Sequence, residues 1–253
     1  MVIALLTDFG LSDPYAGVMK GVILQRRPDA VAVDLTHGVA PQDVRQAAFV
    51  LMESLDFFPD GTLFVCVVDP GVGSDRRILW ARGSRHQFLA PDNGLLSWVE
   101  RREKFHELRS VTNRKLFLEP VSQTFHGRDI FAPVAAALAG GAAPDTLGPR
   151  VPDLERFPFP EPKKARGRVK GEIITFDRFG NAITNLRPGD LPRGARFKHL
   201  GLDLGPLRAY YAEARAGRAV ALTGSSGFIE LSVSKGSFAR HAEASVGDPV
   251  EAA

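Results

Sequence analysis

The first half of the chain alternates short apolar runs with segments whose apolar residues recur at helical spacing. The runs at 2–6, 31–35 and 63–68 predict strands, and the last of them contains no charged or strongly polar residue. The segments 15–26 and 41–55 carry apolar residues three or four positions apart, which predicts helices. Alternating strands and helices of this kind are typical of a largely parallel sheet covered by helices. We therefore expect an α/β N-terminal domain.

The second half of the chain has a different pattern. Prolines are concentrated between residues 140 and 170, which predicts a linker. Beyond it, short apolar runs at 171–176, 219–222 and 228–233 are separated by glycine-rich turns, and no long helical pattern follows. This pattern predicts a smaller all-β, barrel-like C-terminal domain. The expected boundaries are 1–150 for the α/β domain, 151–168 for the proline-rich linker and 169–253 for the β domain.

Composition and charge narrow the class of protein. The 253 residues include 32 basic and 29 acidic side chains, and the pI is near 9.2. This near balance does not indicate the strong positive field of a nucleic-acid binder. The only cysteine, Cys66, lies in an apolar run, so no internal disulfide is expected. The apolar start is too short for a signal sequence and no run is long enough to span a bilayer, so we expect a cytoplasmic protein without a membrane or nucleic-acid partner.

Carboxylates directly follow two of the expected strands. Asp8 comes after the run at 2–6, and Asp69 comes after the run at 63–68. Ligand groups collect at the carboxyl ends of strands in such a sheet, because the loops there surround a crevice. A turn or a helix cap is the alternative role for either aspartate alone. The occurrence of both at strand ends favours a binding site.

Two further polar groups suit the activation of water. Arg76 lies on the same glycine-shaped loop as Asp69, and this loop matches neither a phosphate loop nor a dinucleotide fingerprint. An exposed ion pair is the alternative role for Arg76. His126 precedes an apolar segment at 130–138 that predicts a helix; capping explains its polar neighbours but not the histidine itself. The histidines show no metal-binding spacing, so we expect no metal.

A third polar cluster lies in the expected β domain. Asp177, Phe179 and Asn181 surround a single glycine there. A hairpin turn is one explanation for such a set. A nucleoside site is the other, because an aromatic ring stacks on a purine, an amide bonds its edge and a carboxylate holds a cation. The residues alone leave both explanations open.

Six motifs occur in order along the chain, at 7–10, 15–21, 68–73, 90–96, 124–129 and 177–185. Together they resemble the S-adenosyl-L-methionine hydroxide adenosyltransferase family, metal-free hydrolases of S-adenosylmethionine that are related to the fluorinating and chlorinating enzymes. The resemblance covers nearly the whole chain. It implies an N-terminal α/β domain and a C-terminal β-barrel. It also implies a homotrimer in which each active site lies between the first domain of one subunit and the second domain of its neighbour.

The resemblance assigns roles to single residues. Asp69, Arg76 and His126 match the catalytic set of the family, and Asp8 matches the carboxylate that grips the ribose diol. The other substrate-binding positions that it implies are Asp13, Asn93, Asp177, Phe179, Asn181, Ser225, Phe228, Glu230 and Val233.

Some of these positions are assigned to parts of the substrate. Asp177 and Ser225 match contacts to the methionine end, whereas Asn181 and Phe228 match contacts to adenine. The implied reaction is hydrolysis of S-adenosylmethionine to adenosine and L-methionine, with water or hydroxide attacking ribose C5′ and without a cofactor. Some family members are specialised for the non-biological R epimer of the sulfonium.

Two other functions remain as alternatives. The halogenating relatives carry a tyrosine where Pro70 stands, a Tyr-Ser pair from His126 onward, and a long insert for which Trp80–Ala90 leaves no room. Water is therefore favoured over a halide. A non-catalytic module that binds S-adenosylmethionine or adenosine is the second alternative, although binding alone does not require an aspartate, an arginine and a histidine together.

Overall fold

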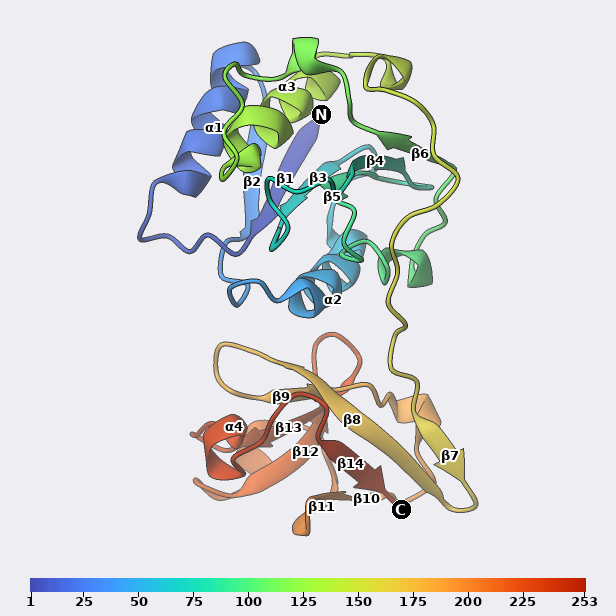
Figure 1. Cartoon of the computed structure of the whole chain (residues 1–253). Helices are drawn as coiled ribbons and strands as arrows, with labels where there is room; N and C mark the ends of the chain where they lie inside the picture. Colours follow the sequence, from blue (N-terminus) through green and yellow to red (C-terminus); the bar gives the residue numbers. More distant parts are fainter. The chain divides into compact units, whose positions relative to one another are not determined.

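The computed structural model describes residues 1–253 and divides into two compact units, Met1–Pro158 and Phe159–Ala253 (Figure 1). The strands of the first unit are β1 (Val2–Thr7), β2 (Val31–Thr36), β3 (Leu63–Val67), β4 (Ile78–Arg82), β5 (Gln87–Pro91) and β6 (Glu107–Ser110). Its helices are α1 (Tyr15–Arg26), α2 (Val44–Ser54) and α3 (Ala132–Ala139), and a π-helical turn at Gly127–Phe131 leads into α3.

The sheet of the first unit is mixed, with strand order β2-β1-β3-β5-β4-β6. β1 is parallel to β2 and β3, and β3 is parallel to β5, but β4 is antiparallel to both β5 and β6. The expectation of a largely parallel sheet is therefore wrong. Residues 83–86 alone connect β4 to β5, and so short a link joins antiparallel neighbours, whereas a parallel pair needs a crossover of about a dozen residues or more.

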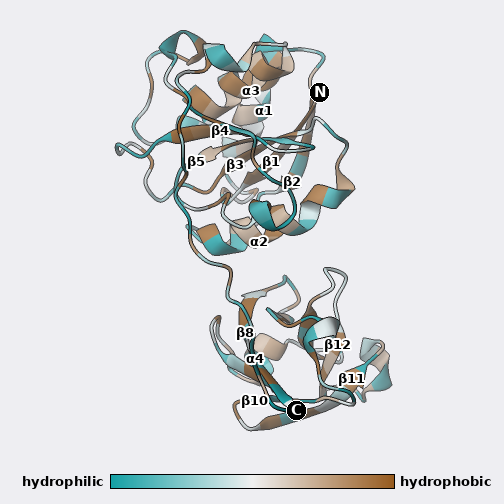
Figure 2. Ribbon diagram, turned by 90° about the vertical axis from the view of Figure 1, so that its right-hand side faces the viewer, coloured by the Kyte–Doolittle hydropathy of each residue, from teal (hydrophilic) through white to brown (hydrophobic).

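Helices cover both faces of this sheet. Ile3 and Leu5 of β1 belong to the same core as Met19 of α1 and much of α3. The alternate residues Ala4 and Leu6 point to the other face and share a core with α2. Figure 1 shows this arrangement, with α1 and α3 on one side of the strands and α2 on the other, and Figure 2 shows the apolar character of α3. Buried on both faces, β1 holds the residues at its carboxyl end in fixed positions.

The second unit is a closed β-barrel, as expected. Its strands are β7 (Lys163–Ala165), β8 (Arg168–Phe176), β9 (Ala182–Thr184), β10 (Arg196–His199), β11 (Leu202–Arg208), β12 (Ala219–Thr223), β13 (Ile229–Val233) and β14 (Pro249–Ala252), with one short helix, α4 (Phe238–His241). The order is β14-β10-β11-β12-β13-β9-β8, and β14 also pairs with β8, which closes the ring. β7 extends the ring as a hairpin partner of β8. Closure removes the free edges that an open sheet of this size exposes.

The proline-rich segment is partly fastened to the first unit. Leu154 is buried in the core beneath α2. The amide of Glu155 donates to Asp92, and the amide of Phe157 donates to the Ser97 hydroxyl. The contact boundary between the units falls after Pro158, and regular structure resumes at β7. The segment thus contributes packing to the α/β unit before it enters the barrel.

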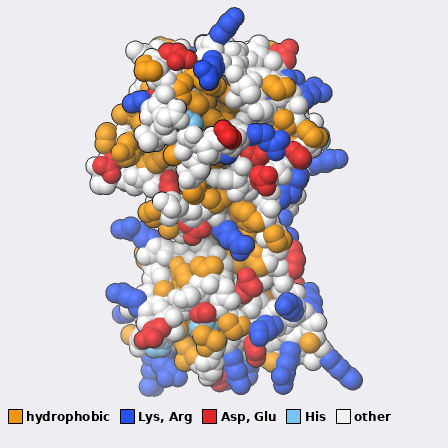
Figure 3. Space-filling view, viewed as in Figure 1, with side chains coloured by type: hydrophobic (Ala, Val, Ile, Leu, Met, Phe, Trp, Pro, Cys, Tyr) orange, Lys and Arg blue, Asp and Glu red, His pale blue; other side chains and the backbone are white.

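Charged side chains of both signs share the surface. Lys and Arg are interspersed with Asp and Glu over the face seen in Figure 3. Many of the basic groups are paired: Arg82 and Arg150 both contact Glu107, and Arg85 contacts Asp60. None of the helices combines the length and the hydrophobicity that a membrane span requires.

Candidate active site

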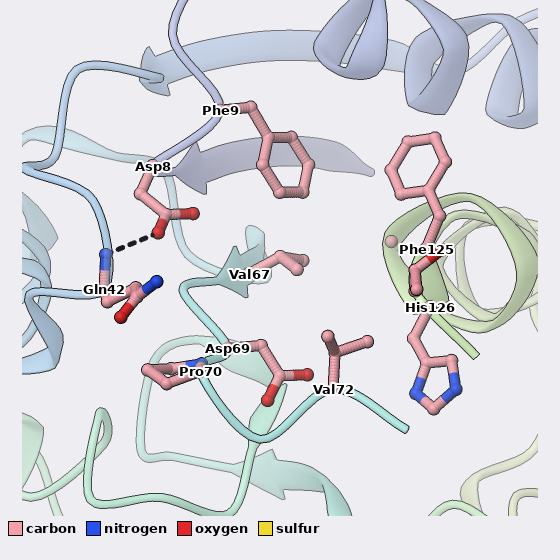
Figure 4. A pocket seen from close by; sticks show the side chains of 11 residues that line it. Asp8, Phe9, Gln42, Val67, Asp69, Pro70, Val72, Phe125 and His126 are labelled. Atoms are coloured by element: carbon pink, nitrogen blue, oxygen red, sulfur yellow. Dashed lines mark hydrogen bonds between the residues drawn. The ribbon is translucent and has the colours of Figure 1, made fainter. Parts of the chain in front are cut away.

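The carboxyl ends of β1 and β3 border a cavity of about 250 Å³. All of its walls belong to the α/β unit. Figure 4 shows the carboxylates of Asp8 and Asp69 on the loops that follow these strands, with the His126 ring on the segment that leads into α3. The lining residues are Asp8, Phe9, Gln42, Val67, Asp69, Pro70, Val72, Thr124, Phe125, His126 and Gly127.

Asp69, Arg76 and His126 are joined by hydrogen bonds. Nε of Arg76 donates to Oδ1 of Asp69 at 2.7 Å and to its Oδ2 at 2.9 Å, and Nη2 of Arg76 also contacts Oδ2. The same Nη2 lies 2.8 Å from Nδ1 of His126. The arginine and aspartate side chains are only 11% and 5% exposed. Folding therefore unites the three predicted catalytic residues in one largely dry cluster.

The arginine contact determines the protonation of the histidine. A guanidinium carries only donors, so Nδ1 of His126 must accept, which leaves the ring proton of the neutral imidazole on Nε2. Burial lowers the pKa of His126, and the positive charge of Arg76 lowers it further, against the opposing effect of Asp69. His126 is thus held neutral, with Nε2–H as a hydrogen-bond donor.

Arg76 itself lies behind the cavity wall, since it is absent from the lining residues. Its neighbour Arg77 is directed elsewhere and pairs with Asp92 and with Asp153, at 2.7 and 3.0 Å. Asn93, one of the expected substrate-binding positions, donates from Nδ2 to the carbonyl of Val68 at 2.9 Å. Asn93 therefore fastens the loop that carries Asp69, and it does not line the cavity.

Two glycines allow this loop and the segment that carries His126 to approach closely. Gly73 has φ +81°, and a Cβ there would lie 2.5 Å from the carbonyl oxygen of Gln123. A Cβ on Gly127 would lie 3.1 Å from Sδ of Met19, which belongs to α1. Side chains at either position would push apart the elements that hold Asp69 and His126.

The Asp8 carboxylate is hydrogen-bonded to the loop before α2. Its Oδ2 accepts a hydrogen bond from the amide of Gln42 at 2.8 Å, the dashed contact in Figure 4. Beside it, Phe9, Phe125 and Tyr15 pack edge to face, with ring centroids 5.0–5.8 Å apart. This aromatic cluster forms an apolar wall next to the carboxylate. Asp13, in contrast, is exposed on the loop between β1 and α1 and does not line the cavity.

In the barrel, Asp177 organises a turn. Its Oδ1 accepts from the amides of Phe179 and Asn181, at 2.8 and 2.9 Å, and its Oδ2 accepts from Nδ2 of Asn181 at 2.8 Å. The hairpin-turn explanation thus describes what these groups do in the subunit. The ring of Phe179 is 75% exposed at the tip of the same turn. Ser225 is exposed as well, in the turn between β12 and β13.

The other barrel positions are buried. Phe228 is 1% exposed, with the Arg187 guanidinium 3.7 Å above its ring and the Phe159 ring stacked at 6.0 Å. Val233 is part of the barrel core. The Phe228 ring is therefore covered by neighbours within the subunit.

Glu230 is a buried carboxylate at the start of β13. The Tyr211 hydroxyl donates to its Oε1 at 2.6 Å, and the Ser232 hydroxyl donates to the same atom at 2.7 Å. Burial raises the pKa of Tyr211, and the hydrogen bond to Glu230 raises it further. The phenol therefore stays protonated and fixes the direction of the carboxylate.

Sequence reasoning missed several cavity residues, namely Phe9, Gln42, Val72 and Phe125, and also Tyr211, the partner of Glu230 in the barrel. For Gln42 a signal was present, because the polar segment after β2 is another strand-end loop. For the two phenylalanines there was none, since an aromatic residue near a strand end reads equally well as core. No group of three or more His, Cys, Asp and Glu side chains is arranged to hold a metal ion.

Both units match domains of a known protein family. The profile of the SAM hydroxide adenosyltransferase N-terminal domain matches residues 3–148, and that of the C-terminal domain matches residues 171–251. A protein of Thermus thermophilus named (R)-S-adenosyl-L-methionine hydrolase is 42% identical over 250 residues, which cover 92% of this chain and 91% of that protein. A protein of Actinoplanes sp. named fluorinase is 31% identical over 219 residues, which cover 76% and 74%.

A solved structure agrees over the whole chain. The crystal structure of a conserved protein from Thermotoga maritima superposes with a TM-score of 0.91 at 34% sequence identity, and the match covers 99% of each chain. The sequence thus matches the family over both units, and the fold is that of a solved protein of 34% identity. This chain belongs to the SAM hydroxide adenosyltransferase family.

Proposed function

We propose that this protein hydrolyses S-adenosyl-L-methionine to adenosine and L-methionine. The oxygen of water forms a bond to ribose C5′, the C5′–S bond breaks with its electron pair going to sulfur, and one proton of the water is released. The observation that carries the proposal is the hydrogen-bonded cluster of Asp69, Arg76 and His126, whose aspartate and histidine line one cavity together with Asp8. The relative named (R)-S-adenosyl-L-methionine hydrolase supports it, and we propose the R epimer as a substrate to test first.

The cavity geometry suggests how the residues divide the work. Asp8 accepts hydrogen bonds from the ribose diol through the lone pairs that Gln42 leaves free. The Nε2–H of His126 donates to the oxygen of the attacking water, while a carboxylate oxygen of Asp69 accepts one of its protons. This arrangement points a lone pair of the water away from both residues and toward C5′. The departure of a sulfonium as a neutral thioether requires no acid.

Arg76 acts through its two neighbours in this proposal. It holds the Asp69 carboxylate from behind and keeps the His126 ring in the Nε2–H form. We therefore describe Arg76 as a positioning residue and Asp69 and His126 as the catalytic ones. The apolar walls from Phe9, Val72 and Phe125 keep bulk water away from the reacting atoms, which strengthens each electrostatic contact.

Halide transfer is the less favoured reaction. The fluorinase relative is less similar in sequence than the hydrolase relative, 31% against 42%. The link of residues 83–86 between β4 and β5 also leaves no space for the insert expected of the halogenating enzymes. A sensing module that binds S-adenosylmethionine without turnover remains the second candidate, distinguished by product analysis.

We further propose that the functional unit is a homotrimer with sites shared between subunits. The α/β unit supplies a ribose carboxylate and a water-activating cluster, and the remaining expected contacts come from barrel positions such as Phe179 and Ser225. The edge strand β2 supports an association, because Val31 and Val33 on it are 55% and 37% exposed. Light scattering of the purified protein tests the state directly, with a mass of three chains expected.

The proposed compartment is the cytoplasm. The only cysteine, Cys66, is free and buried, and burial raises the pKa of its thiol, so it stays unreactive. A free cysteine without a disulfide partner suits a reducing environment.

Product analysis tests the function. The purified protein, treated with EDTA, is incubated separately with the R and S sulfonium epimers of S-adenosylmethionine, and adenosine and methionine are quantified. Equimolar release of both products supports hydrolysis and identifies the preferred epimer. Tight binding without release would favour the sensing module, and a halogenated nucleoside in the presence of chloride or fluoride would favour halide transfer.

A further inference from the structure

A chain of polar side chains runs from the end of β1 to the surface beside α1. The Thr7 hydroxyl lies 2.8 Å from Nδ1 of His37, and Nε2 of His37 lies 3.0 Å from Oδ1 of Asp34. Nζ of Lys20 donates to the other oxygen of Asp34 at 2.8 Å. Thr7 is fully buried and His37 is 4% exposed. The buried members, Thr7 and His37, are both hydrogen-bonded, whereas Asp34 and Lys20 reach the solvent.

The proton positions in this chain follow from its ends. The amide of Phe9 donates to the oxygen of Thr7 at 3.2 Å, so the Thr7 hydroxyl is free to donate its own proton to Nδ1 of His37. Nε2 then carries the ring proton and donates it to Asp34. Burial raises the pKa of Asp34, but hydrogen bonds from Lys20 and His37 outweigh it and hold the pKa below its usual value. The acceptor is thus an ionised carboxylate, held by Lys20 at one oxygen and by His37 at the other.

The same histidine is tied to both sides of Asp8. Asp8 stands between Thr7, which contacts the His37 ring, and Phe9, whose amide is fixed by Thr7. One residue further on, the amide of Gly10 donates to the carbonyl of His37 at 2.8 Å. The backbone around Asp8 is therefore fastened to His37 at two separated points.

The loop after His37 returns to Asp8 as well. The amide of Gln42 donates to the Asp8 carboxylate at 2.8 Å, although Gln42 has φ +67°, a left-handed conformation that is unfavourable for a non-glycine residue. Such a conformation persists only where the surroundings over-determine it. None of Thr7, Asp34 and His37 lines the cavity, so the role of this chain lies in holding what does.

We propose that His37 is a positioning residue that aims the Asp8 carboxylate at a vicinal diol. It does so by bridging Thr7 to the anchored Asp34 and by holding the loop that delivers the Gln42 amide. This inference rests on the proposed function, because the diol it concerns is that of the ribose in S-adenosylmethionine and adenosine. The selectivity of the site for a ribose over a deoxygenated sugar then depends on a residue outside the cavity.

Three variants separate the two ring contacts. His37→Asn keeps an acceptor for Thr7 but loses the contact to Asp34, His37→Gln keeps a donor for Asp34 but loses the contact to Thr7, and His37→Leu loses both contacts.

The affinities of each variant for adenosine and for 2′,3′-dideoxyadenosine are measured by calorimetry, and kcat and KM are measured for the sulfonium substrate. We expect His37→Leu to weaken adenosine binding about 10-fold, because a misdirected Asp8 carboxylate loses much of its hydrogen bonding to the diol. Dideoxyadenosine binding stays within about twofold, KM rises more than kcat falls, and the other two variants lie between.

A matched control lies at the opposite end of the strands, next to the start of β5. His86 is fully buried, and its Nδ1 lies 2.6 Å from Oε1 of Glu103, just before the amino end of β5. His86→Leu likewise removes a contact between a buried histidine and a carboxylate, so it lowers the melting temperature without changing the preference for adenosine over dideoxyadenosine. In the double variant Asp8→Ala/His37→Leu, the loss of adenosine affinity equals that of Asp8→Ala alone, because His37 acts through Asp8.

The outcomes distinguish this inference from the proposed function. Equal losses for both nucleosides in His37→Leu, or no loss, would overturn the positioning role. A wild-type protein that prefers adenosine but hydrolyses neither epimer would refute the proposed function. The binding measurements on His37→Leu would then still decide whether His37 positions Asp8. If the wild type binds no nucleoside, hydrogen exchange at the Gln42 amide decides: faster exchange in His37→Leu than in His86→Leu supports the inference, and equal exchange overturns it.

Discussion

Nη2 of Arg76 lies 2.8 Å from Nδ1 of His126, on the same guanidinium that grips the Asp69 carboxylate. Because a guanidinium only donates, this contact turns the histidine into a donor at Nε2 and excludes Nδ1 as a base. In the proposed mechanism the proton acceptor is then Asp69, which lines the cavity. The division of roles rests on one hydrogen bond, so it is open to direct test.

The titration of His126 provides the first test. Burial and the charge of Arg76 lower its pKa from the ordinary 6.5. The neutral form is therefore favoured in the folded state: its contribution to stability is complete above pH 6.5 and is lost as the pH falls below that value, where the unfolded chain binds the proton first. Nuclear magnetic resonance of the ring is expected to give a pKa below 6.5, with kcat/KM also falling only below 6.5. A ring that titrates above 6.5 would contradict the contact.

Arg76 and Arg77 form a natural pair for mutagenesis. A lysine presents a single ammonium group, so Arg76→Lys cannot hold Asp69 and His126 at once. We expect it to lower kcat by about 10²–10³-fold, the effect of removing one preorganised polar contact, with adenosine affinity nearly unchanged. Arg77→Lys is the control, since Arg77 pairs with Asp92 and Asp153 away from the cavity, and its activity stays within about threefold of the wild type. Similar losses in both would sink the assignment.

The different positions of Asp8 and Asp13 predict different kinetic effects of their substitution. Asp8 lines the cavity, whereas Asp13 is exposed on the loop that follows. Asp8→Ala is expected to raise KM about 10- to 100-fold, because hydrogen bonds to a charged acceptor contribute about 1.5–3 kcal/mol. Asp13→Ala is expected to raise it far less. A larger effect from Asp13 would mean that the loop before α1 closes over the substrate.

Gly73 and Gly61 share a backbone conformation but not an environment. Both have φ +81°, yet a Cβ on Gly73 would meet the Gln123 carbonyl at 2.5 Å, while a Cβ on Gly61 meets nothing within 4 Å. Alanine at either site costs about 1–2 kcal/mol of unfolding free energy for the left-handed conformation. Only Gly73→Ala also displaces the loop that carries Asp69, so kcat falls at least about 10-fold in that variant alone. Denaturant unfolding and steady-state kinetics measure both quantities.

Phe179 tests whether the barrel completes the site. Its ring is 75% exposed, so Phe179→Ala leaves the melting temperature nearly unchanged. Loss of a stacking contact to adenine, worth about 1–3 kcal/mol, raises KM roughly 5- to 100-fold. If the sites are shared between subunits, co-expression of Phe179→Ala with His126→Ala produces a fraction of sites with the wild-type KM and kcat, which neither variant has alone. Unaltered kinetics in Phe179→Ala would remove this residue from the site.

The fold could be predicted where the chain pattern is simple. The alternation of apolar runs and helical spacing in the first half gives β1, α1, β2, α2 and β3 near their observed positions. The hairpin of β4 and β5 was not anticipated, because its antiparallel direction depends on the short link at 83–86 rather than on any periodicity. Without that hairpin, the sheet reads as largely parallel. The barrel was foreseen from the short runs and glycine turns, but its closure depends on pairing between β8 and β14, far apart in the chain.

The site could be predicted only in part for a similar reason. The positions of Asp8 and Asp69 at strand ends predict that they lie together. His126, in contrast, is 50 residues beyond Arg76 in the sequence and directly precedes the π-helical turn, and no sequence pattern predicts its contact with that arginine. Which contacts each group makes is a tertiary property. Asn93 donates to a backbone carbonyl, and Asp177 stabilises a turn. Because the same polar side chains would also suit a substrate contact, the sequence alone does not distinguish the two roles.

Isotope transfer from water tests the central claim most directly. The EDTA-treated protein is incubated with the preferred sulfonium epimer in water enriched in oxygen-18, and both products are analysed by mass spectrometry. Attack of water on C5′ predicts one heavy oxygen in the 5′-hydroxyl of each adenosine and none in methionine. Adenosine without the label, or binding of the substrate with no release of adenosine, would contradict the proposal that this cavity activates water.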